Sequence, residues 1–187
     1  MHIKKNLSTT LINTLLSGGR ILICIKGSPD PDVLAASFAL KSICDYKKIK
    51  ATIVAFTNVS LPQNKALIKK LNIPIHFIKS PPEISTYDSY VVLDHQSAWI
   101  EEIGTKIPCL IHIDHHTPTD DIIKPKMKYI TDAVGAVSTI FASILNNLSL
   151  DLESLLITRI TTALVYGIKV DTDELNHATR NDLEALE

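Results

Sequence analysis

The sequence has few cysteines, no long apolar run and almost no net charge, and each absence argues against a class of protein. Three cysteines in 187 residues, Cys24, Cys44 and Cys109, stand far apart in apolar stretches, which argues against a disulfide framework or a CxxC metal site. No segment reaches the ~18 apolar residues that span a bilayer, and the first residues lack the apolar core of a signal peptide. We therefore expect a cytoplasmic protein with reduced thiols and no membrane partner.

The nearly balanced charge restricts the kind of partner. Nineteen Lys and Arg against twenty Asp and Glu leave a formal net charge of -1, so no general basic surface exists to hold a phosphate polymer. The chain also lacks a GxxxxGK[ST] loop, which argues against a P-loop nucleotide site. Hydrophobic residues make up 45% of the sequence and charged residues 21%, which is typical of globular proteins. Residues 1–187 are therefore expected to form one domain with a substantial core.

Short apolar segments alternate with helical segments along the chain. Strands are predicted at residues 20–25, 51–56, 90–93 and 109–113, where apolar and β-branched residues dominate. Helices are predicted at residues 8–17, 33–46, 64–71, 138–148 and 152–168, where apolar residues recur at helical spacing. We place the cap of the second helix at Asp32 and a surface loop at the proline-rich segment 79–84. The alternation predicts an α/β fold with a mostly parallel β-sheet flanked by helices on both faces.

Acidic residues follow three of the predicted strands. Asp30 and Asp32 come after the first strand, Asp94 directly follows residues 90–93, and Asp114 directly follows residues 109–113. Because the carboxyl ends of parallel strands meet at one edge of a sheet, we expect these side chains to converge there. Converging carboxylates repel one another unless a cation neutralises them, and with an imidazole they form a ligand set for Mn²⁺, Mg²⁺, Fe²⁺ or Zn²⁺. The sequence therefore predicts a metal site at this edge.

Histidines beside the last of these carboxylates supply the imidazoles. In CLIHIDHHTPTDD, residues 109–121, His115 and His116 directly follow the aspartate. Asp171 ends the apolar helix 152–168 at a Gly-containing loop, from where we expect it to close the cluster, and His112 is assigned a supporting structural role. The dinuclear zinc pattern HxHxDH nearly fits residues 110–115, but Leu110 stands at its first histidine, so we set that class aside.

Four motifs, in order and spacing, resemble those of the DHH phosphoesterase superfamily. They are PDPD after the first strand, an aspartate after a later strand, DHH after the next and GIKVDT after a helix; GAVSTI (135–140) matches a small-residue turn of the same proteins. The nearest branch looks like that of the RecJ-related oligoribonucleases, phosphoadenosine-phosphate phosphatases and cyclic-dinucleotide phosphodiesterases. The resemblance runs from about residue 20 to the end. It implies an N-terminal DHH catalytic domain over residues 1–187, without the family's C-terminal substrate-binding domain.

The resemblance further implies a hydrolase that uses two Mn²⁺ ions, with Mg²⁺ as the other choice. The implied ligands are Asp30 for one ion, Asp32, His115 and Asp171 for the other, and Asp94 as the bridge. Asp94 would thereby also be catalytic, and His116 would act on the substrate phosphate or orient its neighbours. Two divalent ions ~3.5–4 Å apart activate water and stabilise charge on both the attacking and the leaving oxygens of a phosphoester.

Lys26 departs from the pattern that the resemblance implies, because the family usually has a histidine ligand of the first metal at this position. An ammonium group cannot donate a lone pair to a metal, and a cation repels it. Three outcomes stay open. The first site binds its ion weakly, Lys26 contacts the substrate phosphate as a cation, or catalysis has been lost.

The sequence thus leads to one principal hypothesis and two alternatives. The principal one is a Mn²⁺-dependent phosphoesterase that cleaves short oligonucleotides or small nucleotides with metal-activated water. The first alternative is a degenerate DHH domain with a regulatory role that binds a nucleotide or a metal. The second is an inorganic pyrophosphatase-type activity. As a partner we expect a small nucleotide or short oligonucleotide, and we leave a homodimer open.

Overall fold

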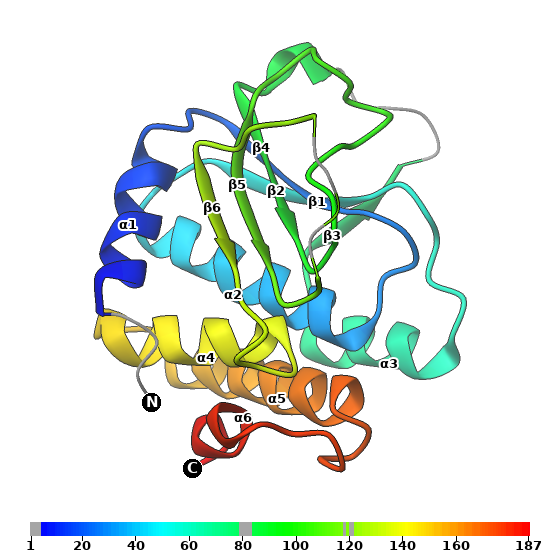
Figure 1. The fold of residues 1–187 in the computed structure, drawn as a ribbon, viewed down its shortest axis with the longest axis vertical. Helices are drawn as coiled ribbons and strands as arrows, with labels where there is room; N and C mark the ends of the chain where they lie inside the picture. The colour runs from blue at the N-terminus through cyan, green and yellow to red at the C-terminus, as the bar shows by residue number, and fades with distance from the viewer. Residues whose placement is uncertain (1–4, 79–83, 118, 120–121) are drawn as a thin grey trace.

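The computed structural model describes residues 5–78, 84–117, 119 and 122–187, so most of the proline-rich segment 79–84 lies outside the described residues. Six strands form one sheet in the order β3-β2-β1-β4-β5-β6 (Figure 1). Their bounds are β1 (Ile21–Ile25), β2 (Ala51–Ala55), β3 (Ile75–Phe77), β4 (Ser89–Leu93), β5 (Cys109–Asp114) and β6 (Met127–Ile130). Every neighbouring pair is parallel, which confirms the predicted α/β class.

The longer helices pack on one face of this sheet. They are α1 (Lys5–Leu16), α2 (Pro31–Tyr46), α3 (Pro62–Leu71), α4 (Val137–Leu148) and α5 (Ser154–Asp171). Alternate residues of β1, Ile21, Ile23 and Ile25, join the core that these helices form. Helix α2 is buried on nearly all sides because it lies between the sheet and α5, and its small residues allow both neighbours to approach. A short helix α6 (Arg180–Ala185) packs on α4 (Figure 1).

The second face has a different cover. Leu22 and Cys24 of β1 point there and pack with Tyr90 of β4 in a separate, smaller core. Among the described residues, the helical part of that cover is the 3₁₀ turn η1 (Ile84–Thr86). Residues 98–107 add Ala98, Ile100, Ile103 and Ile107. The sheet is therefore flanked by helices as predicted, but the long ones gather on one face.

Two strands and the 3₁₀ turn η1 were not predicted from the sequence, and for α6 only the start of a helix near residue 187 was expected. Strands β3 and β6 form the two edges of the sheet, where one face or one backbone edge meets solvent and the apolar signal is weak. The other elements agree with the prediction to within a few residues. Within the described ranges, none of the helices has both the length and the apolar character needed to cross a membrane.

The strand order places a topological switch point between β1 and β4, and we call the carboxyl edge of the sheet at this point the crevice. After β1 the chain enters α2 on the helical face, whereas after β4 it continues into residues 98–107 on the other face. The loops that leave these two neighbouring strands therefore diverge. In open parallel sheets, ligands bind at the carboxyl ends of such a divergent pair.

Candidate metal centre

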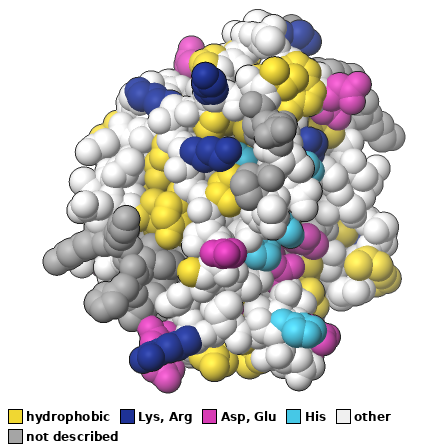
Figure 2. Space-filling model, in the orientation of Figure 1, with side chains coloured by type: hydrophobic (Ala, Val, Ile, Leu, Met, Phe, Trp, Pro, Cys, Tyr) yellow, Lys and Arg dark blue, Asp and Glu magenta, His cyan; other side chains and the backbone are white. Residues whose placement is uncertain are grey.

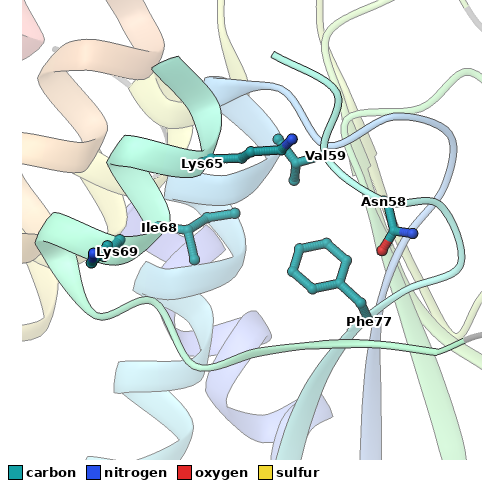
Figure 3. A pocket seen from close by; sticks show the side chains of 6 residues that line it. All are labelled: Asn58, Val59, Lys65, Ile68, Lys69 and Phe77. Atoms are coloured by element: carbon teal, nitrogen blue, oxygen red, sulfur yellow. The ribbon is translucent and has the colours of Figure 1, made fainter. Parts of the chain in front are cut away.

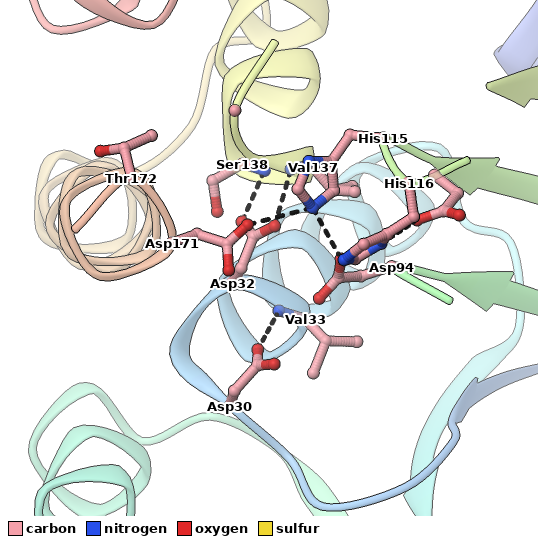
Figure 4. Close-up of polar contacts among 12 residues, drawn as sticks. Asp30, Asp32, Val33, Asp94, His115, His116, Val137, Ser138, Asp171 and Thr172 are labelled. Carbon is pink, nitrogen blue, oxygen red and sulfur yellow. Dashed lines mark hydrogen bonds and ion pairs between the residues drawn. The ribbon is translucent and has the colours of Figure 1, made fainter. Parts of the chain in front are cut away.

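Asp30 and Asp32 lie at the start of α2, and their local roles differ from the sequence prediction. Asp30, not Asp32, is the N-cap, and its Oδ1 accepts a hydrogen bond of 3.0 Å from the Val33 amide. Asp32 lies in the first turn and is 1% exposed. Its two oxygens accept hydrogen bonds from the amides of Val137 (2.6 Å) and Ser138 (2.7 Å), the first residues of α4 (Figure 4). The positive end of α4 thus holds the Asp32 carboxylate at the sheet edge.

Asp94 directly follows β4 and adopts a left-handed backbone, with φ of 54°. Its amide donates a 2.9 Å hydrogen bond to the carbonyl of Ile113 in β5, which extends the pairing of the two strands by one bond. The left-handed turn costs an L-residue about 1 kcal/mol, and aspartate is among the residues that tolerate it. The Asp94 side chain is 4% exposed, so this turn places a buried carboxylate at the centre of the crevice.

The DHH segment and the end of α5 complete the centre. Asp114 ends β5, is fully buried, and accepts a 2.9 Å hydrogen bond from His116 Nδ1. His115 Nε2 lies 3.0 Å from Asp171 Oδ2 and 3.4 Å from Asp94 Oδ1. Asp171 is the last residue of α5, because the helix continues through Gly167 to that point. The prediction of a Gly-containing loop before Asp171 was wrong, since this glycine packs inside the helix against Ser138 and Asp32.

The structure brings most of the predicted ligands into two overlapping groups. Asp94, Asp114, His115 and His116 form one group, and Asp32, His115 and Asp171 form the other; in each, the ligand atoms lie within 4.8 Å of one another. Asp30 belongs to neither group. It nevertheless lies close enough to Asp94 for the charge of Asp94 to raise the pKa of Asp30. In the space-filling view, histidine and acidic side chains reach the surface together on one patch of the face shown (Figure 2).

The donor atoms of these groups fit divalent metal ions. Within the described part of the chain, Asp114 Oδ2 is buried and has no partner. Asp94 Oδ1 and His115 Nε2 are buried too, and their contacts are ion pairs, with each other (3.4 Å) and from His115 to Asp171 (3.0 Å), rather than hydrogen bonds of ordinary geometry. Buried polar atoms are normally satisfied, so atoms left without a partner call for a ligand. Carboxylate oxygens and imidazole nitrogens in this mixture suit Mn²⁺, Mg²⁺, Fe²⁺ or Zn²⁺.

The electrostatics of the centre also favour a bound cation. Burial, with repulsion from Asp94 and Asp171, raises the pKa of Asp32 well above its usual value. Burial and the nearby Asp94 raise the pKa of Asp30 to about 6. Burial alone would lower the pKa of His115, but its contacts with Asp171 and Asp94 prevail and raise it to about 10. Burial is the largest cause for the two aspartates, but neighbouring carboxylates contribute to all three shifts, and divalent cations would neutralise that negative charge.

The remaining histidines have different places. His112 is fully buried, and its Nε2–H donates a 2.7 Å hydrogen bond to the carbonyl of His95, which fixes the backbone just after Asp94. The pKa of His95 is lowered by burial and by the nearby Lys26 ammonium. His76 lies on the edge strand β3 and His177 near Asp173, away from the two groups.

Two features of the centre were not assigned from the sequence. Asp114 was expected among the converging carboxylates but was not assigned as a ligand, yet it both joins a ligand group and holds His116. The amides of Val137 and Ser138 hold Asp32, and the signal that could have found them is the small-residue turn GAVSTI at the start of α4.

The fold and the centre together define a parallel α/β domain with an acidic, histidine-containing site at the carboxyl edge of its sheet. The chain matches the DHH family, N-terminal domain, over residues 20–168, and therefore belongs to the DHH family. The resemblance inferred from the four motifs is confirmed. The uncharacterized protein MJ1633 of Methanocaldococcus jannaschii is 30% identical over 167 residues, which make up 88% of this chain but 33% of the relative. The chain thus spans about a third of that relative's length.

Two solved structures share the fold. An exopolyphosphatase-related protein from Bacteroides fragilis matches with a TM-score of 0.72 and 16% identity, over 100% of this chain and 57% of that chain. A candidate family II inorganic pyrophosphatase from Methanococcus jannaschii matches with a TM-score of 0.64 and 18% identity, over 89% of this chain and 54% of that chain. At these identities the likeness shows the fold alone.

Proposed function

We propose that the centre binds two divalent ions, preferably Mn²⁺, and hydrolyses phosphoester bonds in short oligonucleotides or small nucleotides. The observation that supports this most directly is the convergence of ligand atoms within 4.8 Å of one another in two groups that share His115. Asp114 Oδ2, in one of these groups, is buried and has no hydrogen-bond partner. Asp32, Asp94, His115 and Asp171 would hold the ions, and Asp30 would join them as a ligand of the first. When bound, a pair of such ions activates water and neutralises charge on phosphoryl oxygens.

The protein's own groups would position these ligands and the substrate. The α4 amides keep the Asp32 carboxylate in place, and the left-handed turn does the same for Asp94. His116 donates through Nδ1 to Asp114 and is 42% exposed, so its ring is oriented and its other nitrogen remains for the substrate phosphate. We assign His116 to the substrate and Asp94 to catalysis.

Lys26 is the basis of the alternatives. Within the described ranges its ammonium has no carboxylate partner, and it lies near enough to His95 to affect that imidazole. An ammonium group here would attract the phosphate of a substrate and repel a metal ion. We therefore place Lys26 among the substrate-binding residues. The regulatory alternative requires instead that Lys26 has displaced the first ion.

Substitution of Asp94 tests the proposal. In Asp94→Asn, the loss of a charged ligand should weaken Mn²⁺ binding by at least about 100-fold and abolish hydrolysis of a dinucleotide. Metal content, calorimetric titration and product formation should be measured on the same samples, with Asp151→Asn, at an exposed loop position, as the matched control that stays unchanged. Inorganic pyrophosphate should be assayed beside the dinucleotide.

Three outcomes decide between the readings. Two Mn²⁺ per chain with dinucleotide turnover support the phosphoesterase. One ion or none, without turnover of either compound, contradicts it and favours the regulatory alternative. Phosphate release from pyrophosphate alone identifies the pyrophosphatase-type activity. Lys26→His should then raise affinity at the first site, and unchanged stoichiometry and affinity in that variant would show that Lys26 has no part in metal binding.

A further inference from the structure

A cavity of about 420 Å³ lies at the same edge of the sheet as the metal centre and contains none of its ligands. It is formed by the loop after β2, by one side of α3 and by the end of β3 (Figure 3). Its lining residues are Asn58, Val59, Lys65, Ile68, Lys69 and Phe77. The volume lies within the range of roughly 300–1,000 Å³ that is usual for small-molecule sites.

The cavity shares the edge of the sheet with the metal centre. Asn58 follows β2 and Phe77 ends β3, and both strands run parallel to β1, so their carboxyl ends lie at the edge where Asp30 follows β1. A direct contact joins the two regions. Asn64 of α3 is 3% exposed and donates a 3.0 Å hydrogen bond to the carbonyl of Pro29, the residue before Asp30.

The lining combines an aromatic face with positive charge. Phe77 is 41% exposed, and Ile68 points from α3 toward its ring, while Lys65 reaches along the cavity toward Val59 (Figure 3). Within the described ranges, Lys65 has no ion-pair partner, and the lining contains no acidic residue. An aromatic ring stacks on nucleobases of any sequence, a lysine attracts phosphate, and an asparagine offers donors and acceptors to a base edge.

The walls of the cavity are held in place. Val59 is 5% exposed and belongs to the packed part of the loop. At its carboxyl end α3 is tied to α5, because Arg159 donates to the carbonyls of Leu71 (2.6 Å) and Asn72 (2.9 Å). A site whose walls are already ordered loses less entropy when it binds a ligand.

We propose that this cavity binds a nucleoside of the substrate, with its base on Phe77 and an adjoining phosphate near Lys65. This inference rests on the proposed function and narrows it, because inorganic pyrophosphate has no group that would use an aromatic wall. The centre would therefore act on nucleotide substrates, with one nucleoside fixed beside the loop that carries Asp30.

The test compares a dinucleotide with the same compound lacking one base. Loss of the ring in Phe77→Leu should raise KM for the dinucleotide about 5- to 100-fold, the usual effect of removing a stacked base, and leave kcat and the KM of the abasic compound unchanged. Phe77→Tyr should restore the original KM. Lys65→Gln should raise KM for both compounds, and Lys70→Gln, on the same helix but outside the cavity, should change neither.

A second measurement separates this inference from the proposed function. Adenosine monophosphate is titrated into metal-free protein, and perturbation of the NMR signals of Phe77 and Lys65 reports binding without hydrolysis. If adenosine monophosphate binds more weakly to Phe77→Leu than to the unmodified protein, the nucleoside site is supported even when no substrate is hydrolysed. In that case only the proposed function fails. Equal KM values for the dinucleotide in the unmodified and Phe77→Leu proteins, or equal losses with the dinucleotide and the abasic compound, would overturn the inference while the hydrolase stands.

Discussion

Asp182 of α6 should be essential to the metal centre although it lies outside it. The carboxylate is fully buried. Its oxygens accept hydrogen bonds from the amide of Gly135 (2.9 and 3.1 Å), from the amide of Thr179 (2.7 Å) and from the hydroxyl of Thr139. Gly135 precedes α4 by two residues, and α4 holds Asp32 through its first amides. Asp182 thus fixes the turn that presents these amides.

The cost of Asp182→Ala follows from the three donors that lose their acceptor. A buried donor without a partner costs about 1–3 kcal/mol, so the sum is ~3–9 kcal/mol if all three stay buried. Helix α6 has only six residues and can detach, which would return the donors to water at the cost of its packing on α4. We therefore expect a loss of about 2–4 kcal/mol in the free energy of unfolding.

Urea unfolding and hydrogen exchange would measure this effect. The midpoint should fall, and the Gly135 and Val137 amides should exchange faster in Asp182→Ala. Mn²⁺ affinity should fall about tenfold, as for other groups that orient a metal ligand. Asp182→Asn keeps one acceptor oxygen and should recover part of both losses. An unfolding free energy within ~0.5 kcal/mol of the parent protein, with unchanged Mn²⁺ affinity, would refute this reasoning.

Two further predictions concern packing and pH. In Gly167→Ala the new Cβ would meet Ser138 Oγ and lie 3.2 Å from Asp32 Cα, so urea unfolding should show that the free energy of unfolding falls by about 1–3 kcal/mol. The control Gly27→Ala, in open space at φ of 77°, should lower it by only about 1 kcal/mol. Equal losses in the two variants would contradict the packing argument. Burial raises the pKa of Asp30 from 3.8 to about 6, so the metal-free folded state binds this proton more tightly than the unfolded state, and stability should fall as pH rises through that window. Asp30→Asn should remove this part of the fall, and an identical pH profile in that variant would contradict it.

The central part of the fold was predictable because its strands are buried on both faces. ILICI in β1 and SYVVL in β4 are entirely buried, and such short apolar runs between amphipathic helices have few other arrangements. The edges were not predictable on the same grounds. Strand β3 has three residues and is mostly exposed, and β6 carries Lys128 in its middle. Pairing with a neighbour, rather than local sequence, decides that these segments are strands.

The candidate site divides in a similar way. Aspartates and histidines at strand ends can be read from the sequence, and the structure gathers Asp32, Asp94, His115 and Asp171 at one edge. Their ligand and catalytic roles stay predictions. Which of two aspartates caps α2 depended on backbone geometry, and the sequence favoured the wrong one. The amides that hold Asp32 could not be inferred from side-chain chemistry, because every residue except proline has one.

The left-handed backbone of Asp94 lowers the stability of the fold, while its carboxylate is the group that the proposed function requires. Glycine at this position would relieve about 1 kcal/mol of conformational strain, whereas a β-branched residue would add to it. A search for more stable variants of this chain should therefore return Asp94→Gly, a protein that melts later and, under the proposed function, lacks the ligand shared by the two ions. Variants selected for heat resistance should therefore carry glycine at position 94, whereas variants selected for turnover should keep aspartate there.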